Sequence, residues 1–214
     1  MRFVKLALIL AVIATLAVSR KLNIDRAYIC AERKADDVLR LSVCADACID
    51  ERRNLLMSFG HAFISVENLS DKGIFIYDSE LLPGESVTFS WWAVDKHMGI
   101  WFNIEPNYII HGGRYKNVRT VCMYINPDEV QILNRYLKEH DSYSPLGNCS
   151  KHVTECWNIL AENSEKIESR FIMTPQRLIS EINKFESAAD FHTENCNEIY
   201  YILDGVRHIF ILEK

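Results

Sequence analysis

The spacing of apolar residues changes at the first glycine of the chain. Before it, Val38, Leu41, Ala45 and Cys48 recur at three- and four-residue steps between charged side chains. This spacing places the four side chains on one face of a helix. We therefore expect one or two amphipathic helices within residues 24–58.

After that glycine, β-branched and aromatic residues are interrupted by turn formers, a pattern typical of strands. Four successive strands are predicted, in HAFISVEN (61–68), IFIYDSEL (74–81), SVTFSWWAV (86–94) and GIWFNIE (99–105). Because short turns join them, we expect an antiparallel meander in which the first strand pairs with the second. A further strand is expected in VRTVCMYI, residues 118–125.

Helices and a hairpin are expected in the rest of the chain. The helices are predicted at residues 126–140, 148–160 and 174–185. Each opens with a residue that commonly caps a helix, Asn126, Asn148 or Thr174. Proline follows the first and third caps, where the N–H groups of a helix have no partner. The hairpin is predicted from Asp204-Gly205, a turn between two β-rich runs.

The N-terminus combines a charged start, an apolar run from Leu6 to Val18 and small residues at Ala17 and Ser19. This is the pattern of a secretory signal peptide. An uncleaved anchor is the alternative, although the run is shorter than the ~20 residues that a spanning helix needs. We therefore expect a secreted or extracytoplasmic protein. The expected organisation is a signal peptide at 1–19, a helical extension at 20–59 and one α+β domain at 60–214.

Charge and motif content exclude several classes of function. The chain has a formal net charge of −5, and removing the signal would take away Arg2 and Lys5 but no acids. Nucleic acid is therefore not an expected partner. No P-loop, dinucleotide-binding glycine pattern or zinc-ligand cluster occurs in the sequence, so no nucleotide, cofactor or metal is expected. Membrane contact is expected only through an uncleaved signal, and the oligomeric state is not indicated.

Seven cysteines in an exported chain predict disulfides, because exported compartments oxidise thiols. An odd number leaves at least one cysteine over. Cys149 directly follows the expected cap Asn148, where unpaired helix N–H groups and the helix dipole favour a thiolate and can also bind an oxyanion. We expect Cys149 to stay reduced while most of the other six pair. The alternative is that Cys149 itself belongs to a disulfide. The other six are Cys30, Cys44, Cys48, Cys122, Cys156 and Cys196.

His61 is the histidine best placed to activate that thiol. It follows Gly60, which permits close backbone approach, and it lies on the first expected strand, a rigid mount for a general base. The rival is His152, three residues after Cys149. On the same helix, His152 would lie beside the thiol rather than across a cleft from it.

The order of the two segments that carry these residues resembles the circularly permuted papain-like superfamily. The segments are GHAFISV (60–66) and NCSKHVTECWN (148–158), and the resemblance covers about residues 60–160. The superfamily includes NlpC-type peptidoglycan peptidases and amidases, YiiX-like proteins and lecithin:retinol acyltransferase relatives. It implies an α+β, permuted papain-like core in which an antiparallel sheet or partial barrel packs on the cysteine-bearing helix. The N-terminal helices would be an addition to that core.

The resemblance also implies three catalytic roles: Cys149 as the nucleophile, His61 as the base and a third polar residue that orients the imidazole. If the strand of His61 pairs with the next predicted strand, Asp78 lies opposite His61 and is our candidate for the third role. The alternatives are Tyr77, Glu80 and Glu105.

The expected function is therefore that of a cysteine hydrolase that cleaves an amide bond through a thioester at Cys149. The resemblance favours peptidoglycan-type peptides of a cell wall as substrates. Lipid esters or amides come next, as substrates of hydrolysis or acyl transfer. The rival is a non-catalytic secreted binding module on the same fold, with Cys149 held in a disulfide.

Overall fold

The computed structural model describes residues 32–47, 60–112, 115, 117–191, 193 and 197–211. These residues form an open antiparallel sheet with helices packed on it. The strands of the sheet are β1 (Leu39–Asp46), β2 (His61–Asn68), β5 (Ser86–Val94), β6 (His97–Phe102), β7 (Arg119–Ile125), β8 (Ala189–Asp190), β9 (Ile199–Leu203) and β10 (Val206–Phe210). Their order is β10-β9-β6-β5-β2-β1-β7-β8. In the described part of the chain the two edge strands do not pair, so the sheet is not closed into a barrel.

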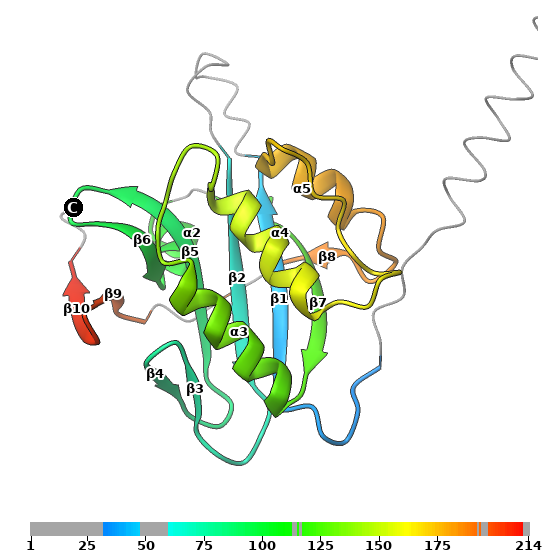
Figure 1. Ribbon diagram of the computed structural model, residues 1–214, viewed down its shortest axis with the longest axis horizontal. Helices are drawn as coiled ribbons and strands as arrows, with labels where there is room; N and C mark the ends of the chain where they lie inside the picture. Colours follow the sequence, from blue (N-terminus) through cyan, green and yellow to red (C-terminus); the bar gives the residue numbers. More distant parts are fainter. Residues whose placement is uncertain are drawn as a thin grey trace, which may run out of the picture.

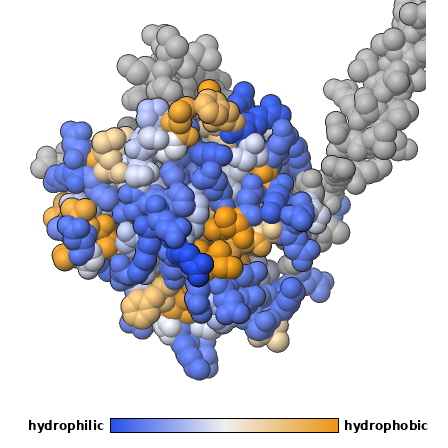
Figure 2. Space-filling model, in the orientation of Figure 1, coloured by the Kyte–Doolittle hydropathy of each residue, from blue (hydrophilic) through white to orange (hydrophobic). Residues whose placement is uncertain are grey.

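Helices pack on both faces of this sheet. The helices are α2 (Ile104–Ile110), α3 (Pro127–Glu139), α4 (Cys149–Leu160) and α5 (Pro175–Ile182). Figure 1 shows α3, α4 and α5 side by side over β2, β1 and β7. The outward side of these helices is mostly hydrophilic in Figure 2, as expected for amphipathic helices that bury their other side. On the opposite face of the sheet, Tyr108 and Ile109 of α2 pack beside Cys44 and Phe63.

Strand β1 replaces a predicted N-terminal helix. Leu39, Leu41, Val43 and Ala45 are fully buried in the core beneath the helices. These apolar residues alternate along the chain, which suits a strand, and β1 pairs with β2 on one side and with β7 on the other. Partners on both sides satisfy its backbone hydrogen bonds. The helical prediction is therefore wrong for residues 39–46, and most of the remaining predicted extension lies outside the described residues.

The strand predicted at 74–81 is a separate small hairpin. β3 (Ile74–Ile76) and β4 (Ser79–Leu81) pair with each other around Tyr77 and Asp78. Tyr77 has a φ of 57°, in the left-handed region, so the chain reverses direction there. β2 pairs with β1 and β5 instead. The predicted pairing of the His61 strand with 74–81 is therefore wrong.

The strand predicted at 99–105 ends earlier than expected. β6 stops at Phe102, and Asn103, with a φ of 60°, is the N-cap residue of α2. Glu105 consequently lies in the first turn of a helix rather than on a strand. This turn carries Glu105 back over the sheet face on which α2 packs.

The helix starts and the final hairpin are confirmed. Asn126 forms a capping box with Glu129 at the start of α3, and the side chains of Asn148 and Thr174 accept hydrogen bonds from the first turns of α4 and α5. β9 and β10 pair around Asp204-Gly205, where both residues have positive φ. Local capping and turn chemistry therefore determined these boundaries.

No helix in the described part of the chain has the length and apolar composition that crossing a membrane requires. The predicted signal peptide, residues 1–19, lies outside the described residues.

Candidate active site

Cys149 is the first residue of α4, and its thiol contacts the strand β2. Asn148 caps the helix by accepting a hydrogen bond from the Lys151 N–H at 3.0 Å. On the β5 side of β2, pairing begins only at Ile64. The start of α4 can therefore approach His61 and Ala62, the first two residues of β2. There the Cys149 sulfur lies close to the side chain of His61 and to the backbone N–H of Ala62, and both favour its thiolate. The helix start and the strand thus bring together residues 88 positions apart.

A buried carboxylate holds the other side of the His61 ring. Nε2 of His61 lies 2.9 Å from Oε1 of Glu105, and Glu105 is fully buried. An ionised carboxylate only accepts hydrogen bonds, so Nε2 carries the proton of this contact. Nδ1 is then the nitrogen left to face the thiol of Cys149. Sulfur, imidazole and carboxylate form one proton-transfer chain.

Three residues of β5 surround Glu105 with hydrogen-bond donors. Thr88 donates to Oε2 at 2.9 Å, and Ser90 and Trp92 donate to Oε1, the latter at 3.1 Å. The Trp92 ring also lies against the His61 ring, with 4.2 Å between centroids. A buried charge is stable only when it is paired and hydrogen-bonded, and this cage meets that requirement.

Electrostatics favour a thiolate and an imidazolium in the resting site. Burial by itself would raise the pKa of the Cys149 thiol, but the charge of His61 and the hydrogen bonds to the sulfur hold it below its ordinary value. Burial would lower the pKa of His61, yet the thiolate and Glu105 raise it above its ordinary value. The pKa of Glu105 is lowered despite its burial, because His61 and Ser90 donate to it. The thiol is therefore poised as a nucleophile.

Asp78, the residue predicted to orient His61, does not contact it. Its carboxylate is 41% exposed and forms an ion pair with Lys138 at 2.7 Å. Tyr77 donates instead to Asp141, and Glu80 is exposed. Asp78 was placed opposite His61 by a strand pairing that does not occur. Of the four candidates for the third position, the structure brings only Glu105 to His61.

The rival histidine, His152, also faces away from the thiol chemistry. Its Nδ1 lies 3.0 Å from the Tyr136 hydroxyl.

Sequence reasoning missed Thr88, Ser90 and Trp92, which alternate along one face of β5 and all carry a donor. That alternation is visible in the sequence, but it points to a carboxylate only once α2 is known to cover the same face.

Within the described residues, Cys44, Cys149 and Cys156 are free thiols. We predicted that most of the six cysteines other than Cys149 pair, and no such disulfide is found at Cys44 or Cys156; Cys30, Cys48 and Cys196 lie outside the described residues. Burial raises the pKa of Cys44 and of Cys156 above the ordinary thiol value. The lowered pKa of Cys149 distinguishes it from these two buried thiols.

A cavity of about 570 Å³ lies behind the site, on the sheet face opposite α3 and α4. Its lining includes the hydroxyl side chains of Ser42, Ser65, Thr88 and Thr120 but neither Cys149 nor His61. Within the described ranges, no group of three or more His, Cys, Asp or Glu side chains is placed to hold a metal ion.

Comparisons with protein-family models, with curated proteins and with solved structures found no match for this chain. The chemistry assigned to the site therefore rests on its geometry.

Proposed function

We propose that this protein is a cysteine hydrolase that cleaves an amide bond, with Cys149 as the nucleophile, His61 as the general base and acid, and Glu105 as the residue that orients His61. One observation carries the proposal: a free thiol with a lowered pKa sits at a helix start in contact with a histidine whose other nitrogen is held by a buried carboxylate. Glu105 replaces Asp78 in the third role.

Each group has a defined part in the reaction. The Cys149 sulfur attacks the carbonyl carbon, and the backbone N–H groups at the start of α4 that the Asn148 cap does not occupy stabilise the oxyanion. The C–N bond then breaks as His61 gives its proton to the leaving amine, which leaves a thioester on Cys149. His61 next takes a proton from water, the resulting hydroxide attacks the thioester, and release of the acid regenerates the thiolate and imidazolium.

The substrate class and compartment belong to the same proposal. A histidine-bearing strand that precedes the cysteine-bearing helix resembles the order of the permuted papain-like superfamily, which favours an exported enzyme that acts on peptidoglycan-type peptides. Lipid esters or amides are the second substrate class. The free thiol of Cys149 favours an enzyme over a binding module in which this cysteine is locked in a disulfide.

A thiol-reactive epoxide probe at mildly acidic pH tests this function. We expect modification of Cys149, because its thiolate persists where ordinary thiols are protonated. Peptide mapping identifies the modified residue. Cys149→Ala should abolish the labelling and Cys122→Ala should preserve it. Unmodified Cys149 in the folded wild-type chain, or equal labelling of Cys122, would contradict the proposal.

A further inference from the structure

One buried hydroxyl of α4, that of Ser150, has no hydrogen-bond partner within the described residues. Ser150 is fully buried and directly follows Cys149. A buried polar atom without a partner lowers the stability of the fold, so its presence calls for a structural or functional explanation. The steps of the proposed hydrolysis do not involve this side chain.

Ser150 stands at a position that suits an apolar residue. Ser150, Val153, Thr154 and Trp157 follow the spacing of one helix face, and all four are buried. Val153 and Trp157 belong to the main core. An alanine would fit the same face without burying a polar atom. Packing alone therefore does not account for a serine at this position.

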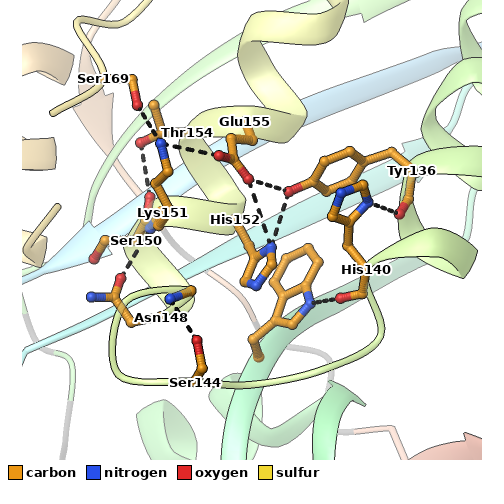
Figure 3. A network of polar contacts seen from close by, with 12 residues as sticks. Tyr136, His140, Ser144, Asn148, Ser150, Lys151, His152, Thr154, Glu155 and Ser169 are labelled. Carbon is orange, nitrogen blue, oxygen red and sulfur yellow. Dashed lines mark hydrogen bonds and ion pairs between the residues drawn. The ribbon is translucent and has the colours of Figure 1, made fainter. Parts of the chain in front are cut away.

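Thr154, one turn further along α4, shows how a hydroxyl on this face can be satisfied. Its Oγ1 donates to the backbone oxygen of Ser150 at 2.8 Å, a contact that Figure 3 shows beside the Ser150 side chain. A serine or threonine in a helix can donate in this way to the carbonyl four residues earlier. For Ser150 that carbonyl belongs to Leu146, which precedes the helix cap Asn148. The Ser150 hydroxyl is therefore available to a different acceptor.

The sulfur of Cys149 is an acceptor close to this hydroxyl. Burial opposes the thiolate of Cys149, and the side chain of Ser150 is among the groups near enough to favour it. A serine O–H is a donor and a thiolate is a charged acceptor, so a contact between them is stronger than one between two neutral groups. Because Ser150 has no exposed surface, its hydroxyl acts on groups inside the protein rather than on a bound substrate.

We propose that Ser150 is a further catalytic residue, whose hydroxyl donates a hydrogen bond to the thiolate of Cys149. This inference rests on the proposed function, because it assigns the hydroxyl to the same nucleophile. The thiolate gives the buried hydroxyl an acceptor, which explains why a polar side chain stands on an apolar helix face.

The hydroxyl contributes at two points of the reaction and keeps its own proton at both. Before the attack, its hydrogen bond stabilises the thiolate relative to the thiol. After the thioester has formed, the sulfur is the leaving group when hydroxide attacks. The same hydrogen bond favours its departure, because a thiolate of lower pKa leaves more readily. His61 moves the protons, and Ser150 stabilises the charge on the sulfur.

The titratable groups around the Cys149 sulfur come from other elements. His61 of β2 lowers the pKa of the thiol against the effect of burial, and Glu105 of α2 acts through His61. Tyr143, in the loop before α4, is also nearby, since burial and the Cys149 thiolate raise its pKa. Replacing Ser150 leaves all three groups in place. A change in the thiol pKa would therefore report the Ser150 hydroxyl.

Ser150→Ala tests this role through the pH dependence of Cys149 alkylation in the full chain. Iodoacetamide modification would be quantified on the Cys149 peptide, and we expect its midpoint to rise by about one unit, which is about tenfold less thiolate in mild acid. The matched control is Thr154→Val, which also removes a buried hydroxyl from this face of α4. It should leave the midpoint unchanged, because Thr154 donates to a backbone oxygen. Equal shifts in both variants would mean a general disturbance of the helix and would overturn the role of Ser150.

Folding stability gives a second measurement. In a chain that carries Cys149→Ala the hydroxyl has lost its sulfur acceptor, so adding Ser150→Ala should raise the denaturant midpoint of unfolding. In a chain that retains Cys149 the same change also removes the contact with the thiolate, and it should raise the midpoint less or lower it. The difference measures the coupling between hydroxyl and sulfur. Equal changes in the two backgrounds would overturn the proposal.

The alkylation profiles also separate a failure of this role from a failure of the proposed function. A wild-type midpoint below that of a free thiol that Ser150→Ala does not move would leave the hydrolase standing and remove Ser150 from its site. The hydroxyl would then have another acceptor, such as a buried water. A wild-type midpoint at or above that of a free thiol that Ser150→Ala raises further would support the contact between hydroxyl and sulfur. It would contradict the activated thiol that the hydrolase requires.

Discussion

Glu105 has no exposed surface, and its charge is sustained by the residues around it. His61, Thr88, Ser90 and Trp92 each place a donor on its carboxylate. Removing any one of them leaves a buried acceptor less satisfied, at a cost of about 1–3 kcal/mol. The orientation of His61 thus depends on a set of neutral donors that never touch the thiol.

Two variants, Glu105→Gln and Asp78→Asn, each replace a carboxylate by its amide. Together they test whether Glu105 orients His61. In Glu105→Gln, loss of the negative charge lowers the pKa of His61 and so weakens the ion pair that stabilises the thiolate. We expect the pKa of Cys149 to rise by about one unit, which is about tenfold less thiolate in mild acid. Asp78→Asn is the control, and it should leave the alkylation rate of Cys149 unchanged because Asp78 contacts Lys138. Equal effects of the two variants would contradict the role of Glu105.

The elements differ in how far local sequence determines them. Caps at Asn126, Asn148 and Thr174 act on their own helices, so the sequence predicted where α3, α4 and α5 begin. β1 is different, because its apolar residues fit a helical spacing as well as a strand alternation. Only its two pairing partners, β2 and β7, decide between these structures.

A core substitution in β1 tests its place at the centre of the sheet. Leu41 is fully buried, so Leu41→Ala should lower the free energy of unfolding by about 2–5 kcal/mol, measured by denaturant titration. Leu82→Ala is the matched control, because Leu82 is 51% exposed and its change should stay within about 0.5 kcal/mol. A small effect at Leu41 would mean that this segment does not lie in the core.

At the scale of the whole molecule, sequence reasoning selected Cys149 and His61 from local signals but ranked Glu105 only as an alternative to Asp78. Cys149 follows a helix cap, and His61 follows a glycine at the start of a strand. Glu105 reaches His61 only because β6 ends at Phe102 and α2 turns back over the sheet. This turn from β6 into α2 depends on tertiary structure and leaves no local signal in the sequence. The strand pairing that we inferred from short turns therefore led to Asp78 instead.

Export is the prediction that concerns the whole chain. The charged start, the short apolar run and the small residues Ala17 and Ser19 predict cleavage near Ser19–Arg20. N-terminal sequencing of protein secreted by an expressing cell should find a chain that begins near Arg20. An intact Met1 on membrane-bound protein would identify an anchor instead.

The central claim is that Cys149 exists as a thiolate paired with His61, and its alkylation rate as a function of pH tests this most directly. Iodoacetamide modification would be quantified on the Cys149 peptide from mildly acidic to alkaline pH, in the wild-type chain and in His61→Ala. We predict a wild-type midpoint below that of a free thiol, about 8.5, and a midpoint in His61→Ala at or above that value, because burial then outweighs the stabilising groups that remain. A wild-type midpoint at about 8.5 that His61→Ala does not move would contradict the account.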